Sequence, residues 1–189
     1  QAAAHQAAAH QAAAHQAAAH QAAAHQAAAL CDYRWMERTP AATVTLRPAR
    51  LEDLGVLFEQ QREPEANRRA NFPARGREAF FTHWTERILG DDTVRVRTIA
   101  VDGFISGYVV AWWQDGRRTV GYWLGQDFWG RGIGTRALRS FLDVEKTRPL
   151  YADTDVGNVA SRRLLERCGF ELVETVDTGE VRYDLLILR

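Results

Sequence analysis

The sequence has little cysteine, almost no lysine and no long hydrophobic run, and each shortage excludes a class of protein. The 189 residues include only two cysteines, Cys31 and Cys168, too few for a secreted scaffold held by disulfides. The longest apolar run, Tyr108 to Trp113, is too short to cross a bilayer. We therefore expect a cytoplasmic protein without a membrane partner.

The sequence also lacks an excess of positive or negative charge. The chain has 24 basic and 24 acidic side chains, which gives a formal net charge of zero. A protein that binds a polyanion along its surface needs a surplus of positive charge. We therefore expect no nucleic-acid partner. Among the basic residues only Lys146 is a lysine, a usage typical of a GC-rich coding sequence.

The first 30 residues are a low-complexity repeat. Five copies of Gln-Ala-Ala-Ala-His are followed by Gln26-Ala-Ala-Ala-Leu30. Alanine favours a helix, but a period of five spreads the histidines around that helix instead of along one face, so no metal site is expected. Met36 is the only methionine. We expect the native start there, with residues 1–35 a tail and residues 36–189 the functional domain.

A glycine-rich loop is the most informative motif. Trp129-Gly130-Arg131-Gly132-Ile133-Gly134-Thr135 joins an expected strand to an amphipathic helix. Glycines on alternate positions leave the backbone N–H groups accessible, and the helix adds its own unpaired N–H groups and the positive end of its dipole. The loop therefore predicts a pyrophosphate site that needs neither lysine nor metal.

A dinucleotide-binding fold is the weaker interpretation of the same loop. Gly132 to Ala137 fits the pattern G-x-G-x-x-A, and Asp153 lies near the position of a ribose-binding acid. In that fold, however, the first glycine follows its strand almost at once, whereas residues 125–131 intervene here. About fifty residues remain after the loop, too few for the rest of a doubly wound sheet. A glycine turn without a ligand also stays open.

A second motif follows about two dozen residues later. Asn158 is a good helix N-cap and Gly169 a good residue to end the same helix. The inward stripe of this helix consists of Ala160, Leu164, Leu165 and Cys168. Cys168, next to the terminating glycine, is interpreted as a core residue and not as a nucleophile.

With both motifs in this order, the chain from about Thr43 to Leu188 resembles the GNAT superfamily of N-acetyltransferases. The resemblance implies that the glycine loop binds the pyrophosphate of acetyl-CoA and that the Asn158-x-x-Ser161 helix lies along its pantetheine arm. The combination of Trp-Gly-Arg-Gly with Asn-x-x-Ser resembles the motifs of one branch of the family, the ribosomal-protein N-terminal acetyltransferases. Trp129 stands where many members have Arg or Gln. The implied cofactor-binding residues are Leu124, Trp129, Gly130, Arg131, Gly132, Ile133, Gly134, Thr135, Asn158 and Ser161.

The order of elements fits that fold. One strand, two helices and three antiparallel strands precede an α-β-α-β-β segment, with Asp102-Gly103 and Asp115-Gly116 as hairpin turns. We predict an α/β (α+β) GNAT fold: a mixed, mostly antiparallel sheet of six to seven strands with helices on both faces.

The resemblance also suggests catalytic groups. The backbone amide of Leu124 is the candidate for contact with the oxyanion and the pantetheine. Ser161 is the candidate acid, because Leu165 stands where many relatives have a tyrosine, although the Ser161 hydroxyl could equally cap its helix. Glu180 is the candidate base, with Asp153 and Asp155 as alternatives. His83 is expected to be a surface or packing residue.

The predicted function is transfer of an acetyl group from acetyl-CoA to a primary amine by direct attack. The acceptor is a small molecule or a protein or peptide N-terminus. Residues 63–75, which shape the acceptor site in relatives, hold Arg68, Arg69 and Arg75 beside Glu63 and Glu65 and therefore select no sign of charge. A non-catalytic acyl-CoA sensor or scaffold stays open, as does a homodimer.

Overall fold

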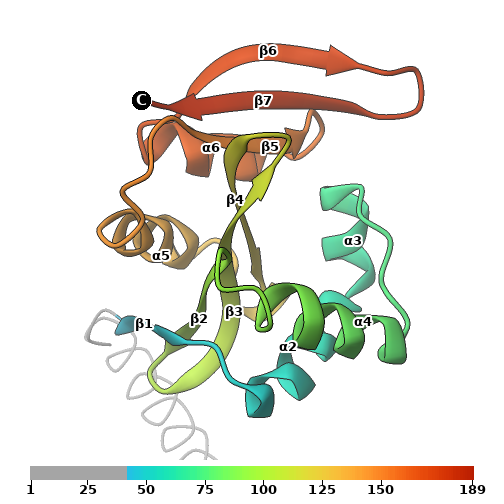
Figure 1. Ribbon diagram of the computed structural model, residues 1–189, viewed down its shortest axis with the longest axis vertical. Coiled ribbons are helices and arrows are strands. Elements are labelled where there is room, and N and C mark those ends of the chain that lie inside the picture. The colour runs from blue at the N-terminus through green and yellow to red at the C-terminus, as the bar shows by residue number, and fades with distance from the viewer. Residues whose placement is uncertain (1–41) are drawn as a thin grey trace, which may run out of the picture. The chain divides into compact units, whose positions relative to one another are not determined.

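A twisted seven-stranded sheet organises residues 42–189, the part of the chain that this computed structural model describes (Figure 1). Residues 43–189 form one unit. The repeat, the Met36 start and the boundary at residue 35 lie outside the described residues.

The strands are β1 (Val44–Pro48), β2 (Arg95–Val101), β3 (Phe104–Gln114), β4 (Arg117–Leu124), β5 (Leu150–Asp155), β6 (Glu171–Asp177) and β7 (Arg182–Leu188). Their order across the sheet is β1-β2-β3-β4-β5-β7-β6. The pair β4–β5 is parallel and the other pairs are antiparallel. The predicted mixed, mostly antiparallel sheet is confirmed, and a doubly wound dinucleotide fold is excluded.

Both predicted hairpin turns are present. Asp102 and Gly103 have φ of 50° and 86°, and Asp115 and Gly116 have φ of 50° and 75°. Two central residues with positive φ define the turn that matches the twist of the adjoining strands. These turns fix the register of β2, β3 and β4.

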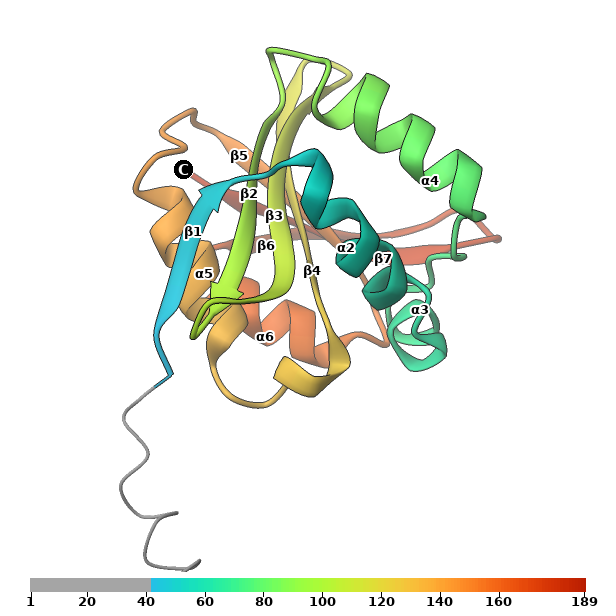
Figure 2. The ribbon, with the colours of Figure 1, turned by 90° about the horizontal axis from the view of Figure 1, so that it is seen from below.

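Helices cover both faces of the sheet (Figure 2). On one face, η1 (Leu51–Asp53) and α2 (Leu54–Gln61) pack with α4 (Arg77–His83) and its π-helical extension η2 (Trp84–Ile88). On the other, α5 (Ile133–Leu142) and α6 (Val159–Arg167) cover a second core. The short 3-10 helix η3 (Gln126–Phe128) leads from β4 into the glycine loop.

Helix α3 (Pro64–Ala70) was not anticipated in the segment between the first two predicted helices. Pro64 occupies its first turn, and Asn71 ends it with a left-handed φ of 48°. Proline at a helix start and asparagine just past its end are both recognisable signals. The helix could therefore have been found from the sequence.

Strands β4 and β5 separate soon after they meet. They pair only at Arg118–Leu150 and Thr119–Tyr151, although β4 continues to Leu124 and β5 to Asp155. Beyond those two pairs, the facing backbone groups of the two strands are available to a ligand. The divergence opens the sheet at its centre.

Candidate active site

A cavity of about 980 Å³ lies where β4 and β5 diverge. Its walls come from both strands, from α3 and α4, from the loop before α5, and from α6. Segments far apart in the sequence therefore meet at one site, which includes both motifs found in the sequence.

The glycine loop forms one end of the cavity. Gly130 and Gly132 have φ of 71° and 69°, a left-handed backbone that side chains rarely tolerate. Gly132 is also the N-cap of α5, so the unpaired N–H groups of that helix start here. Arg131 is exposed with its guanidinium 5.9 Å from the Phe128 ring centre, and it does not line the cavity.

Gly134 serves helix packing. A Cβ at this position would lie 2.6 Å from Cδ1 of Leu164, so the absent side chain lets α6 approach α5. This contact brings the two sequence motifs together across the cavity.

The Leu124 peptide faces the gap between the strands. The N–H of Gly125 donates to Ser106 O of β3 at 2.9 Å, and the direction of backbone groups alternates along a strand. The carbonyl of Leu124 instead accepts from Nε1 of Trp129 at 2.7 Å. Because N–H and C=O of one strand residue point the same way, the Leu124 N–H is directed away from β3, toward the side where β5 has diverged.

Asn158, and not Ser161, caps α6. The Asn158 side chain accepts from the Ser161 N–H at 3.1 Å, which leaves the Ser161 hydroxyl free of that role. The hydroxyl instead pairs with the Tyr122 hydroxyl at 2.7 Å. Burial raises the pKa of Tyr122 far above its usual value, so it stays protonated. Sequence reasoning missed Tyr122, since only the fold brings β4 to α6.

The three candidate carboxylates have different surroundings. Asp153 lines the cavity, and loss of hydration there raises the pKa of its carboxyl. Asp155 also lines the cavity, but its Oδ1 accepts from Gly157 N–H at 2.8 Å and so shapes a turn. Glu180 is exposed, as Asp153 is, but it lies in the connection between β6 and β7 and does not line the cavity. Asp153 and Asp155 are therefore the candidate carboxylates that lie in the cavity.

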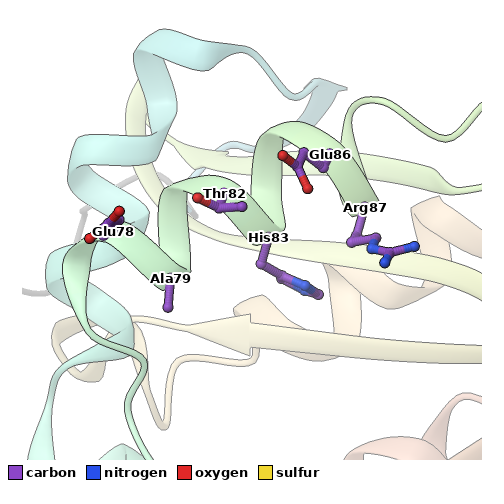
Figure 3. Close-up of a pocket in the computed structure, with 6 residues that line it drawn as sticks. All are labelled: Glu78, Ala79, Thr82, His83, Glu86 and Arg87. Carbon is purple, nitrogen blue, oxygen red and sulfur yellow. The ribbon is translucent and has the colours of Figure 1, made fainter.

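His83 lies at the other end of the cavity, beside two arginines. His83 and Arg87 leave the α4–η2 helix on the same side and border a shallow groove along it (Figure 3), and both also line the main cavity with Arg75. Burial lowers the pKa of His83, and the positive charges of Arg75 and Arg87 lower it further. His83 is therefore neutral near pH 7.

Two of the three arginines of the acceptor segment share one carboxylate. Arg68 and Arg69 both bind Glu65, each at 2.7 Å, and Glu63 accepts from Gln126 N–H at 2.8 Å. Arg69 also stacks on Trp129, 4.7 Å from the ring centre. Arg75 has no such carboxylate partner among residues 42–189 and lies over the Phe72 ring.

Comparison with known proteins identifies this arrangement. Residues 43–171 match the model of the acetyltransferase (GNAT) domain family. The chain belongs to the GNAT acetyltransferase family. It is accordingly an N-acetyltransferase that uses acetyl-CoA as the acetyl donor, as the motifs predicted.

Solved GNAT structures share the fold at low sequence identity. The ribosomal L7/L12 α-N-protein acetyltransferase RimL with coenzyme A has a TM-score of 0.67 and 19% identity, over 79% of this chain and 96% of that one. The aminoglycoside acetyltransferase AAC(6')-Ib with coenzyme A has a TM-score of 0.66 and 20% identity, over 77% and 94%. A GNAT acetyltransferase from Bacillus anthracis has a TM-score of 0.64 and 13% identity, over 78% and 94%. No curated protein sequence matches this chain.

The structures with a similar fold do not identify the acceptor of this chain. They include an enzyme named for a protein N-terminus and another named for aminoglycosides, at identities that establish the fold alone. The acceptor must be inferred from the cavity of this GNAT chain itself.

Proposed function

We propose that this GNAT acetyltransferase acetylates a small primary amine or free α-amino group in the cavity between β4 and β5. The observation that carries the proposal is the composition of that one cavity. It joins the glycine loop, the free edge of β4, the hydroxyl of Ser161 and the carboxylate of Asp153.

The residues present fit coenzyme A. The left-handed backbone at Gly130 and Gly132 exposes N–H groups at the start of α5, which suits a pyrophosphate. Adding a Cβ at either position would place it in open space, so the loop surface is accessible to a ligand. Arg163 and Arg167 of α6 also line the cavity and supply positive charge.

Leu124 is the proposed donor to the reacting carbonyl. Bound acetyl-CoA supplies an acetyl group activated as a thioester. The Leu124 N–H points into the gap left by β5 and can donate to the negative charge that develops on the acetyl oxygen. A preorganised N–H donor of this kind contributes strongly because it needs no reorganisation during the reaction.

Ser161 and Tyr122 form the proposed acid. The Tyr122 hydroxyl lies 2.7 Å from Ser161 Oγ and also donates to the Ser161 carbonyl at 3.2 Å. When it donates to Oγ instead, Ser161 can give its own proton to the departing sulfur and take the Tyr122 proton in return. Burial raises the pKa of Tyr122, so this proton is in place at the start of each turnover. Two hydroxyl groups thus replace the tyrosine that Leu165 cannot supply.

Asp153 is the proposed base. A primary amine attacks only after it loses its extra proton, and the Asp153 carboxylate lies on the β5 wall of the cavity. Its raised pKa makes it a better proton acceptor than an ordinary aspartate. Glu180, the residue expected from the resemblance, becomes the second candidate.

Location and assembly remain predictions. No helix within residues 42–189 is long and apolar enough to cross a membrane. The sequence alone predicts a cytoplasmic location and no nucleic-acid partner. It leaves open whether the protein forms a homodimer.

The test is thiol release by the full chain with acetyl-CoA and a panel of amines. We expect micromolar binding of acetyl-CoA, no binding of NAD, and release of CoA only when an amine is present. Gly132→Asp should abolish acetyl-CoA binding, because it places a negative charge and a strained residue at the phosphate loop. Acetylation of hydroxyl acceptors alone would contradict the proposal.

A further inference from the structure

The acceptor end of the cavity combines positive charge with aromatic walls. Arg75 and Arg87 line it together with His83, and neither arginine has an ion pair with a carboxylate among residues 42–189. By contrast, Arg68 and Arg69 in the neighbouring helix α3 share the carboxylate of Glu65. Arg75 and Arg87 therefore present guanidinium groups that no carboxylate of the described residues binds.

Arg75 and Arg87 line the same cavity as His83. Both are close enough to His83 to act on its imidazole, although one comes from the segment before α4 and the other from η2. Arg75 also acts on the Tyr108 hydroxyl, which belongs to β3. Four elements thus converge on this end of the cavity.

Tyr108 adds a neutral donor beside Arg75. Its hydroxyl accepts from Gln61 Nε2 at 3.2 Å and so keeps its proton to donate. Burial raises the pKa of Tyr108 to about 12, which keeps that proton in place near neutral pH. A guanidinium with an adjacent hydroxyl donor is well suited to a carboxylate.

Few acidic side chains lie at the acceptor end of the cavity. Asp91 lines the cavity near Arg87, but its Oδ1 accepts from both N–H and Oγ1 of Thr93, at 2.8 and 2.7 Å. Glu86 does not line the cavity. Asp91 stays ionised, so a polycationic acceptor would meet two arginines and one carboxylate at this end.

The remaining walls are apolar. Trp84 packs edge-on against Tyr108, with ring centres 4.8 Å apart, and Ile88, Val94, Val110 and Trp112 also line the cavity. Such walls favour an acceptor whose central part is small and apolar.

We propose that the acceptor is a small primary amine that carries a carboxylate, with Arg75, Arg87 and Tyr108 binding the carboxylate and the aromatic walls holding an apolar body. This inference rests on the proposed N-acetylation at the same site and specifies its substrate class. It excludes aminoglycosides and other polycations as substrates.

The primary test uses matched acceptors with the full chain and acetyl-CoA. One set contains apolar amino acids with the amine in the α, β or γ position, and the other contains their carboxamides and decarboxylated amines. Peptides with a free N-terminus and kanamycin complete the panel. We expect the carboxylate to raise kcat/KM by about 10- to 100-fold over the matched amide. Preference for the peptides over the free amino acids would overturn the assignment of a small acceptor.

Arg75→Met tests the assignment while keeping the contact with Phe72. It should lower kcat/KM for the carboxylate-bearing acceptor by about 10- to 100-fold and leave the matched amide unchanged. Arg75→Lys should recover part of the loss, since it restores the charge without the fork. Arg68→Ala removes the same charge from an exposed position outside the cavity and should change neither acceptor. Thermal midpoints of the variants show that folding is intact.

A binding assay separates the two proposals. Thermal stabilisation of the CoA-loaded protein is measured with N-acetyl amino acids and with their N-acetyl amides. Stabilisation by the acids alone, lost in Arg75→Met, supports the carboxylate site even if no amine is acetylated. Equal or better turnover of amines without a carboxylate would overturn the carboxylate inference and leave N-acetylation standing. Absence of both turnover and stabilisation would overturn both.

Discussion

At the scale of single residues, the surroundings of each side chain determine which residues are candidates for the catalytic acid and base. Ser161 is relieved of helix capping by Asn158 and bonds to Tyr122, a residue 39 positions away. Asp153 and Glu180 are both exposed, but only Asp153 lines the cavity, where loss of hydration raises the pKa of its carboxyl. These differences give the catalytic assignments separate tests.

Removal of either hydroxyl of the Ser161–Tyr122 pair should slow turnover. Ser161→Ala should lower kcat by about ten- to a thousandfold with little change in acetyl-CoA affinity. Tyr122→Phe should show a smaller loss, because Ser161 keeps a proton but loses its donor. Steady-state kinetics and calorimetry measure the two quantities. Ser140→Ala, on the exposed side of α5, is the matched control, and unchanged kcat in Ser161→Ala would exclude the acid role.

Asp153→Asn should lower kcat/KM by about 10²- to 10⁴-fold without destabilising the fold. A raised carboxyl pKa means that the folded state disfavours the charged form, so this carboxylate's contribution to stability falls as pH rises through that pKa. Removing the charge therefore leaves the thermal midpoint at pH 7 unchanged or higher. In the intact protein kcat/KM should fall as pH drops through the raised pKa, and Asp153→Asn should lack this acid limb.

Glu180→Gln is the control for that assignment. We expect its pH profile and kcat to match those of the unaltered chain. Loss of activity in Glu180→Gln together with normal activity in Asp153→Asn would restore Glu180 as the base.

At the scale of elements, the site depends on how closely helices and strands approach. The divergence of β4 from β5 opens the cavity, and the contact of Gly134 with Leu164 sets α6 against α5. The close approach of α5 to α6, which carry the two motifs, therefore depends on the absence of a side chain at Gly134.

Gly134→Ala should destabilise the fold by about 1–3 kcal/mol, because the new methyl group overlaps Leu164 Cδ1. The double variant with Leu164→Ala should lose less stability than the sum of the two single changes. Chemical denaturation measures both. Gly55→Ala is the matched control: its new Cβ meets no atom within 4 Å, and in helix α2 it should stabilise by about 0.4–1 kcal/mol. Additive losses at Gly134 and Leu164 would show that the contact is unimportant.

At the scale of the whole molecule, buried carboxylates join the strands to the segments that cover them. Asp53 accepts from Arg47 at 2.6 and 2.7 Å, from Thr98 at 2.7 Å and from Arg50 N–H at 3.0 Å. Glu145 binds Arg118 at 2.7 Å. Burial opposes ionisation of Asp53 and Glu145, but these hydrogen bonds, with those from Thr147 to Glu145, outweigh it and hold both pKa values below their usual range.

Stability should therefore fall in acid. A lowered pKa contributes stability that is complete above the unfolded pKa, about 4, and is lost as pH falls through the folded pKa. Asp53→Asn should cost about 1–3 kcal/mol at pH 7 and flatten the decline of the thermal midpoint below pH 4. Asp143→Asn, an exposed change of the same kind, should do neither. An acid decline as steep in Asp53→Asn as in the unaltered chain would contradict the role of this carboxylate.

The sequence by itself determined the family, the cofactor and most of the fold. Both motifs depend on local physics: glycine at left-handed positions, asparagine at an N-cap and glycine after a helix can be recognised without distant contacts. Alternation in the strands and the Asp-Gly turns similarly fix the hairpins. Even α3 carried a local signal in Pro64 and Asn71.

Only the tertiary structure decided which side chains share the cavity. The Tyr122–Ser161 pair and the place of Asp153 in the cavity depend on how β4, β5 and α6 come together. The mixed charges of residues 63–75 selected no sign in the sequence. In the structure Arg68 and Arg69 share Glu65, whereas Arg75 lines the same cavity as Arg87. Desolvation and ion pairing depend on distances in space, and spacing along the chain does not encode them.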